Sequence, residues 1–383
     1  MIKVHPNKSI LQLTAMILTI TGIFVASNIY TLIPIYISIS DSLGVTENQV
    51  VIAGSLFTLF YAFGLLSFGP ASDIFGRRRI LVLGMFVSAL STLAVGFSDT
   101  LMSLYVSRSI QGITLGSFAP VAFAYAFDLY SPKNRTLLLV FINTGFLMAG
   151  IIGQLISSSI NIYYPWEYVF YFFSLCYISL FVISYFVLPK TARPQKNKTS
   201  LLKIFIRLLK NRSLIKCYGI AVTLLLSFVA LYDGIGRFFT GSEEELFVLR
   251  AVGLIGATLS LFTGRLIEKF GVGVTLKTGL MIGGVSLSFM TIFKDWISLM
   301  ALSVLFVASI SLLIPTVITL IGTLGGNHRA KALSLYSFIL LAGASLASPI
   351  AVALNFNHLL FLLICFFFFN LLSSYLLGKE IDL

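Results

Sequence analysis

The chain has 383 residues, of which 58% are hydrophobic and only 10% are charged, and its mean hydropathy is +0.99. Soluble globular domains carry about 25% charged residues, so this composition excludes an ordinary soluble enzyme, a disordered chain and a disulfide scaffold. In a soluble protein the net charge of +12 would suggest a nucleic-acid partner. Here the charge must lie in the connections between apolar segments, and we expect no nucleic-acid partner.

Apolar segments follow one another along the whole chain, and each is long enough to cross about 30 Å of hydrocarbon. They occupy roughly residues 10–38, 49–69, 80–98, 101–127, 136–158, 166–188, 214–236, 246–264, 273–293, 296–322, 332–353 and 358–377. The connections between them are short and leave no room for a large soluble domain. The sequence therefore predicts an all-α integral membrane protein with twelve transmembrane helices.

The basic residues between the predicted helices are concentrated on one side of the membrane. Of the 26 lysines and arginines, 22 fall on the side that holds both chain ends and two fall on the other, while Arg108 and Arg250 lie within predicted helices. Cytoplasmic loops of membrane proteins are enriched in lysine and arginine. This asymmetry predicts that both termini are cytoplasmic, in a cell membrane that we expect to be bacterial.

A short glycine–acid pattern occurs twice, 195 residues apart, after the second and after the eighth predicted helix. Its members are Gly69, Asp73 and Gly76, followed by Arg77, in the first copy and Gly264, Glu268 and Gly271 in the second. Arg135 and Arg329, each at the start of a later predicted helix, are 194 residues apart. A parallel duplication of two six-helix halves explains these spacings.

The duplication divides the chain into an N-terminal six-helix half (1–188), a basic linker (189–213) and a C-terminal six-helix half (214–383). Lys203 and Arg207 share one face of a predicted helix in the linker. A basic amphipathic helix of this kind suits the surface of the inner leaflet.

Three stretches of the first half resemble the signatures of a known family. Residues 69–79 (GPASDIFGRRR), 108–116 (RSIQGITLG) and 128–135 (DLYSPKNR) resemble motifs of the major facilitator superfamily, and they are most similar to its drug:proton antiporter branch. The resemblance implies a secondary transporter in which two six-helix halves rock around a shared midplane site. It also implies a small-molecule solute, a proton as the coupling ion, and no cofactor.

The resemblance further implies a gate on the cytoplasmic side. The residues expected there are Gly69, Asp73, Gly76, Arg77, Asp128, Arg135, Gly264, Glu268, Gly271 and Arg329. Asp73 is expected at the positive end of the eleventh helix, near Arg329, and Glu268 at that of the fifth. Asp128 is expected near Arg77 or Arg135. The alternative is that these charges only set the topology and form weak surface ion pairs.

Arg108 is predicted to lie about 10 Å from the outer end of the fourth helix, within the hydrocarbon. Because a charged side chain is costly in hydrocarbon, it should face the interior of the bundle. The resemblance implies a role in substrate binding or proton coupling, and Asn28 in the first helix is a polar residue that could line the same cavity. A structural hydrogen-bond hub with Gln111 is the alternative.

Asp233 and Arg250 are the other charges of interest within predicted helices. The local explanation pairs Asp233 with Arg237, one helical turn away, and Arg250 with residues 243–245 at the rim. The functional explanation places both in the cavity, where Asp233 binds a proton or cation and Arg250 a carboxylate. The first predicted helix contains no acid, although many relatives carry a coupling carboxylate there.

The predicted function is an ion-coupled exporter of a small carboxylate-bearing or zwitterionic metabolite, such as an opine-type metallophore. Two arginines against one aspartate within the helices favour such a solute over a lipophilic cation. The alternatives are a multidrug:proton antiporter, an importer of a small metabolite and, more distantly, a sensor or scaffold with a transporter fold. The missing nucleotide-binding loop argues against an ATP-driven pump, and we expect no enzyme because no predicted span carries two acids. We expect no metal site, because metal-ligand spacing is absent, and we expect a monomer.

Overall fold

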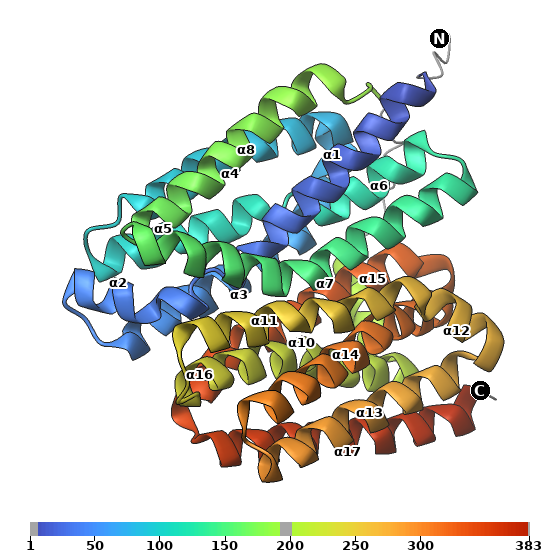
Figure 1. Ribbon diagram of the computed structural model, residues 1–383. Coiled ribbons are helices and arrows are strands. Elements are labelled where there is room, and N and C mark those ends of the chain that lie inside the picture. The colour runs from blue at the N-terminus through green and yellow to red at the C-terminus, as the bar shows by residue number, and fades with distance from the viewer. Residues whose placement is uncertain (1–6, 192–200, 382–383) are drawn as a thin grey trace. The chain divides into compact units, whose positions relative to one another are not determined.

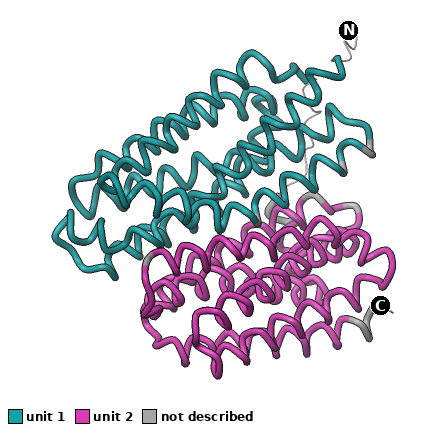
Figure 2. Tube along the Cα trace, in the orientation of Figure 1, with its two compact units in different colours: residues 1–198 teal, residues 199–383 magenta. Residues whose placement is uncertain are grey.

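The computed structural model describes residues 7–191 and 201–381, and every regular element in these two ranges is a helix (Figure 1). The chain divides into two compact units, residues 1–198 and 199–383 (Figure 2). The boundary between the units falls inside the linker predicted over residues 189–213.

The helices of the first unit run in chain order from the N-terminus to the predicted linker. They are α1 (Lys8–Ser27), the short 3-10 helix η1 (Ile33–Ile35), α2 (Tyr36–Leu43), α3 (Glu47–Phe75), α4 (Arg77–Gly96), α5 (Leu101–Leu115), α6 (Ala119–Leu129), α7 (Pro132–Tyr163) and α8 (Glu167–Val187).

The second unit repeats this succession of long helices with short breaks. Its elements are α9 (Leu201–Leu209), α10 (Arg212–Phe238), α11 (Glu243–Ala257), η2 (Thr258–Phe262), α12 (Thr263–Phe270), α13 (Val272–Ile292), α14 (Trp296–Leu324), η3 (Gly326–His328), α15 (Arg329–Ser345), α16 (Ala347–Ala353) and α17 (Phe356–Ile381).

The described part of the chain contains 11 helical segments that are long and apolar enough to cross a membrane. A further pair within α7, Leu137–Phe146 and Met148–Tyr163, is bent by 43° and gives a twelfth span when it is counted as one. The prediction of an all-helical membrane protein with twelve transmembrane helices is confirmed.

Two of the predicted helices are interrupted in the structure. The segment predicted over 10–38 ends as α1 at Ser27 and resumes after a turn as η1 and α2, while the segment predicted over 101–127 is divided into α5 and α6. Each break precedes a proline, Pro34 in η1 and Pro120 in the first turn of α6. A proline nitrogen cannot donate to the carbonyl four residues earlier, which favours a break at each place. The span predicted over 101–127 is present as Leu101–Leu129, whereas the one predicted over 10–38 is shorter, Lys8–Ser27.

The glycine–acid patterns are more helical than the sequence predicts. α3 continues to Phe75 and α12 continues to Phe270, so each pattern lies in a helix except for its last glycine. Gly76 and Gly271 are then the single residues that separate one long helix from the next. The predicted loops at these two places are therefore one-residue turns.

The pairing of helices repeats from one unit to the other. In the first unit α1 packs on α7, α3 on α5 and α4 on α8, and in the second unit α10 packs on α15, α11 on α14 and α13 on α17. Glycine allows close approach at matched places. A Cβ on Gly112 would lie 2.3 Å from the carbonyl oxygen of Phe57, and a Cβ on Gly256 would lie 2.4 Å from that of Val304. Both six-helix halves therefore follow one plan.

Candidate functional site

Gly76 and Gly271 make the same tight turn in the two halves. Gly76 separates α3 from α4 with φ of +94°, and Gly271 separates α12 from α13 with φ of +84°. Residues with a side chain rarely adopt a positive φ, so both positions favour glycine. The residue after each glycine therefore stands at a helix N-terminus, directly beside the end of the preceding helix.

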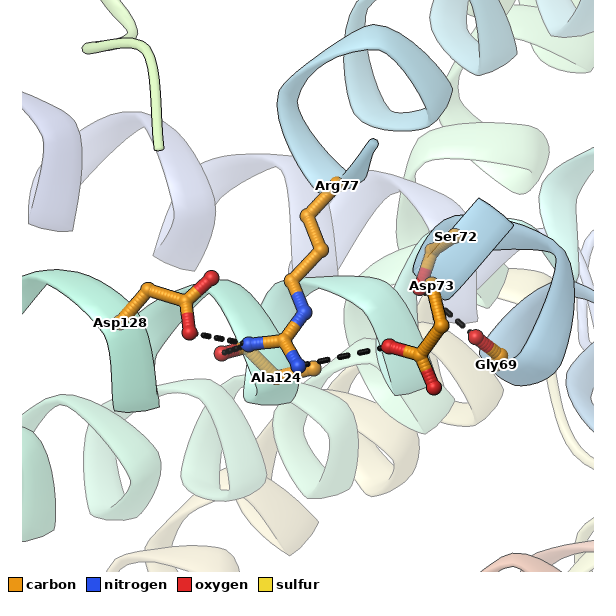
Figure 3. A network of polar contacts seen from close by, with 6 residues as sticks. All are labelled: Gly69, Ser72, Asp73, Arg77, Ala124 and Asp128. Atoms are coloured by element: carbon orange, nitrogen blue, oxygen red, sulfur yellow. Dashed lines mark hydrogen bonds and ion pairs between the residues drawn. The ribbon is translucent and has the colours of Figure 1, made fainter. Parts of the chain in front are cut away.

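Arg77, the first residue of α4, connects the ends of three helices (Figure 3). Its Nη1 donates to the carbonyl oxygen of Ala124 in α6 at 2.6 Å and to the carboxylate of Asp128, and its Nη2 lies 3.4 Å from Oδ1 of Asp73. The side chain of Asp128 is 28% exposed and that of Asp73 is 52% exposed. Of the two partners predicted for Asp128, the structure selects Arg77, and this pair is stronger than the longer, more exposed contact with Asp73.

Arg78 and Tyr125 hold the end of α8. Arg78 donates from Nε to the carbonyl oxygen of Leu188 at 2.6 Å and from Nη2 to that of Tyr185 at 2.5 Å. The hydroxyl of Tyr125 donates to the carbonyl oxygen of Pro189 at 2.5 Å. The last carbonyls of a helix lack donors within the helix, and these side chains supply them. The beginning of the predicted linker is therefore fixed to the first unit.

Arg135 lies in the first turn of α7, with its guanidinium carbon 4.1 Å from the centroid of the Phe127 ring. Nearby in sequence, Tyr130 donates its hydroxyl to the carbonyl oxygen of Leu11 at 2.7 Å. Burial raises the pKa of the Tyr130 hydroxyl to about 12, so it stays protonated at neutral pH and keeps donating. The connection between α6 and α7 is thereby fastened to α1.

The second copy of the pattern is exposed. Gly264 and Glu268 both lie on the solvent-accessible side of α12. Arg329 begins α15, and its Nε lies 2.9 Å from the position that a Cβ on Gly322 would take. The predicted contacts of Asp73 with the eleventh helix and of Glu268 with the fifth would join the two units, and they remain predictions.

A buried polar network inside the first unit is centred on Arg108 of α5. Arg108 donates from Nη1 to Oε1 of Gln111 at 2.6 Å and from Nη2 to the carbonyl oxygen of Asn28 at 3.1 Å. Gln111 donates to Oδ1 of Asn28 at 2.9 Å and to Oγ1 of Thr92 at 2.9 Å. Asn28 donates to the hydroxyl of Tyr177 at 2.5 Å. The network joins α1, α4, α5 and α8 and contains the Arg108–Gln111 hydrogen bond that the sequence suggested.

The charge of Arg108 is not neutralised by its surroundings. The side chain is fully buried, and its guanidinium carbon lies 4.1 Å from the centroid of the Phe57 ring and 5.6 Å from that of Phe170. Within residues 7–191 and 201–381 its hydrogen-bond acceptors are an amide and a carbonyl, and its Nε has none. Burying an ion without a counter-ion is costly, and aromatic faces offset this only in part. The site is therefore suited to an anion.

Sequence reasoning missed four members of this site, Thr92, Tyr177, Phe57 and Phe170. A tyrosine deep in the sixth predicted helix was the one available signal, because a buried hydroxyl needs a hydrogen-bond partner. The two phenylalanines give no signal, because apolar rings occur throughout every predicted span.

A second group of buried charges lies in the second unit. Asp233 of α10 is 1% exposed and accepts a hydrogen bond from Nε of Arg237 at 2.6 Å. Arg250 of α11 is 3% exposed, and its Nη2 lies 2.9 Å from the position that a Cβ on Gly236 would take. Glycine at position 236 therefore lets the guanidinium of Arg250 reach the turn of α10 that carries Asp233. Of the acidic side chains that the structure describes, Asp233 is the buried one.

The acids predicted to pair with Arg250 lie at the start of α11. The carboxylate of Glu245 accepts a hydrogen bond from the backbone N–H of Ser242 at 2.9 Å, as part of a capping box. Glu244 is exposed, and the side chain of Glu243 lies outside the described residues. The local Asp233–Arg237 pair is thus present, together with the deep burial that the functional explanation needs.

Known proteins resemble this chain in sequence and in fold. The sequence profile of the Major Facilitator Superfamily matches residues 18–242. An "uncharacterized transporter" of Buchnera aphidicola subsp. Baizongia pistaciae is 27% identical over 277 residues, which cover 70% of this chain and 68% of that protein. A "bicyclomycin resistance protein homolog" of Haemophilus influenzae is 27% identical over 263 residues, which cover 65% of each. The match thus spans about two thirds of the length of these relatives.

One solved structure has the same fold over nearly the whole chain. It is a bacterial homologue of the human lysosomal transporter Spinster, in an inward-facing and unoccupied conformation. The TM-score is 0.76 at 15% sequence identity, and the match covers 98% of both chains. At this identity the likeness shows the fold alone.

Proposed function

Because the chain belongs to the Major Facilitator Superfamily, we propose that it is an ion-coupled secondary transporter that exports a small carboxylate-bearing or zwitterionic solute. The family and the fold are those of transporters rather than enzymes. In such transporters two helical halves expose a midplane site alternately to the two sides of the membrane.

The observation that carries the choice of solute is the uncompensated charge of Arg108. Its guanidinium is fully buried among neutral partners in the described part of the chain. A planar guanidinium binds a carboxylate through two parallel hydrogen bonds, and a desolvated site strengthens that attraction. A carboxylate on the solute would supply the missing counter-charge during transport, with Gln111 and Asn28 as neighbouring polar contacts.

We assign the coupling proton to Asp233. The first predicted helix has no acid, and Asp233 is the buried carboxylate among the acidic side chains described. Its carboxylate accepts a hydrogen bond from Arg237, and the guanidinium of Arg250 reaches the same turn of α10. Separation of this cluster when the unit rearranges would let Asp233 take up a proton, and its reassembly would release it.

The proposed cytoplasmic gate uses the Gly76 and Gly271 turns with their neighbouring charges. Arg77 connects α3, α4 and α6, so this corner of the first unit moves as one body. In the proposed latch, Asp73 faces the start of α15 near Arg329. The proposed orientation, with both termini in the cytoplasm, is supported by the 22 basic residues on one side.

Export is the proposed direction, and the name of one relative supports it. The Haemophilus influenzae relative is named as a homologue of a bicyclomycin resistance protein. The same name favours the second candidate function, a multidrug:proton antiporter for lipophilic compounds. The two candidates differ at Arg108, because a lipophilic cation gains nothing from a buried guanidinium.

Metabolites measured inside and outside cells, with and without the gene, test the direction and identify the cargo. A carboxylate that accumulates inside cells lacking the gene supports export, whereas a loss of its uptake indicates import. The identified cargo is then followed in proteoliposomes that contain the purified protein and an imposed proton gradient. Transport that continues unchanged after a protonophore collapses the gradient contradicts proton coupling.

The variant Arg108→Gln separates an anion site from a multidrug site. We expect at least about a tenfold loss of carboxylate transport, because a charge-assisted hydrogen bond is lost. Arg108→Lys keeps the charge but loses the planar pair of donors. Its carboxylate transport should lie between that of the wild type and that of Arg108→Gln. Arg79→Gln is the matched control, since Arg79 is an exposed arginine of the same unit. Wild-type carboxylate transport by folded Arg108→Gln protein would overturn the anion site.

A further inference from the structure

An open cavity of about 450 Å³ lies in the first unit and is lined by residues of α2, of the last turn of α7 and of the first turn of α8. Figure 1 shows where these helices lie. The volume of the cavity would admit a small molecule, and one side of it is open. Among the residues that line it are Ser38, Asn161, Tyr163, Tyr164, Trp166 and Glu167. All of these belong to the first unit, and none belongs to the Arg108 network.

Two polar groups of the cavity wall are buried without a partner. Trp166 is 2% exposed, and its indole Nε1–H has no acceptor among the described residues. The Oε2 atom of the neighbouring Glu167 is also buried and has no donor there. A buried donor or acceptor left unsatisfied destabilises the protein. An adjacent donor and carboxylate in one cavity are complementary to a ligand that carries both an acceptor and a cation.

The second tryptophan of the chain shows what a structural indole does in this fold. Trp296, the first residue of α14, donates its Nε1–H to the carbonyl oxygen of Glu245 in α11 at 3.0 Å. Trp166 also stands at a helix entry, that of α8, but its N–H has no acceptor among the residues that the structure describes. The Trp166 donor is therefore available to a ligand.

The remaining walls define the kind of ligand. Tyr163 is 79% exposed and Tyr164 is 57% exposed, so aromatic faces border the open side. Asn161 donates from Nδ2 to Oγ of Ser38 at 2.8 Å, which uses one of its two amide N–H groups and leaves its side-chain oxygen as an acceptor. A carboxylate, acceptor oxygens and aromatic faces together favour an ammonium group. The indole N–H requires an oxygen acceptor on the same molecule.

The structure assigns to this cavity the binding of a primary ammonium that has an oxygen acceptor beside it. Amino alcohols and amino acids have this chemistry, and so does the headgroup of phosphatidylethanolamine. The ammonium contacts the Glu167 carboxylate and the tyrosine faces, and the oxygen accepts from Trp166 Nε1. The site lies within one unit and is independent of the proposed cargo, because it depends on neither Arg108 nor Asp233.

Fluorescence of Trp166 tests the assignment directly, because the chain has only 2 tryptophans. In the variant Trp296→Phe, reconstituted in phosphatidylcholine nanodiscs, Trp166 is the single indole. Titration with ethanolamine should give a saturable change in its emission, whereas ethanol, which lacks the ammonium, should give little. No response to ethanolamine, or an equal response to ethanol, overturns the assignment.

Glu167→Gln in the same background should weaken ethanolamine binding about tenfold or more, because the charge on the acceptor is removed. Asp99→Asn is the matched control, since Asp99 is an exposed acid at the same end of the unit. Equal affinities in Glu167→Gln and its parent contradict the proposal. If Trp296→Phe does not fold, calorimetric titration of the wild type against Glu167→Gln gives the same comparison.

Lipid composition distinguishes the two sources of the ligand. In nanodiscs that contain phosphatidylethanolamine, a lipid headgroup in the cavity would compete with added ethanolamine and abolish the fluorescence response. A response that persists at unchanged affinity assigns the cavity to a free amine. Transport assays are not needed for either result, so failure here is separable from failure of the proposed function.

Discussion

Arg77 and Asp128, 51 residues apart in sequence, form an ion pair that joins the start of α4 to the end of α6. Arg77 also donates to the carbonyl oxygen of Ala124 in α6, so the pair has a backbone anchor. The second acid beside Arg77, Asp73, is held loosely at 3.4 Å and is largely exposed. The two carboxylates beside Arg77 therefore differ. The Asp128 carboxylate holds two helices together, whereas the Asp73 carboxylate is exposed enough to contact another partner.

Neutralising each carboxylate should separate these tasks. Asp128→Asn is expected to lower the free energy of unfolding by about 1 kcal/mol, because a half-buried charged hydrogen bond is lost. Asp73→Asn should change it by less than about 0.5 kcal/mol and yet impair transport, because Asp73 is the proposed latch. Thermal unfolding in detergent and transport at matched protein level are the two measurements. Normal transport by Asp73→Asn would contradict the proposal that Asp73 forms the latch.

The two positive-φ turns should be sensitive to a single methyl group. Gly76→Ala and Gly271→Ala force a side chain into a left-handed conformation, and each should destabilise the protein by about 1–2 kcal/mol. Gly264→Ala is the control, since a Cβ there meets no atom within 4 Å and the residue is helical. It should be neutral or stabilise by up to about 1 kcal/mol. Equal melting temperatures for Gly76→Ala and Gly264→Ala would contradict the need for glycine in the turn.

The parts of the site that could be predicted lie within one helix or within one repeated pattern. Asp233 and Arg237 are one turn apart on α10, so their spacing alone indicates the pair. The repeat of the glycine–acid pattern indicates both turns, although it does not show that α3 continues through Gly69 and Asp73. Pro34 and Pro120 coincide with breaks, but Pro70 and Pro315 lie inside α3 and α14, so prolines alone could not have predicted where the helices break.

The contacts that could not be predicted are those between helices that are far apart in sequence. The hydrogen bond from Asn28 to Tyr177 spans 149 residues, and the contact of Arg108 with Asn28 spans 80. Hydropathy identifies each span but gives no rotation about its axis, so it does not say which polar residues face one another. The contact of the Phe57 ring with Arg108 could not be predicted for the same reason.

A double-mutant cycle at Asp233 and Arg237 should distinguish coupling from structure. Asp233→Asn leaves Arg237 without its carboxylate and should destabilise the protein by about 1–3 kcal/mol, and Arg237→Gln should do likewise. The double variant restores a neutral pair, so its stability should recover by more than about 0.5 kcal/mol over the sum of the singles. Proton-driven transport should remain lost in the double variant. Recovery of coupled transport along with stability would show that Asp233 is structural only.

In the variant Gln111→Glu, the new carboxylate should compete with the solute for Arg108. Oε1 of Gln111 already lies 2.6 Å from Nη1 of Arg108, so a glutamate there would give the guanidinium a permanent counter-ion. A carboxylate solute would then have to displace an ion pair in a desolvated site, and we expect its transport to fall at least about tenfold. The Gln111→Glu protein should remain folded, because the hydroxyl of Thr92, which lies 2.9 Å from the Gln111 amide nitrogen, can donate to the carboxylate oxygen that takes its place. Thr92→Val in the wild-type background is the control, since it removes one neutral contact and leaves the charge of Arg108 uncompensated. Carboxylate transport that survives in Gln111→Glu but fails in Thr92→Val would mean that hydrogen-bond geometry, rather than the charge of Arg108, selects the cargo.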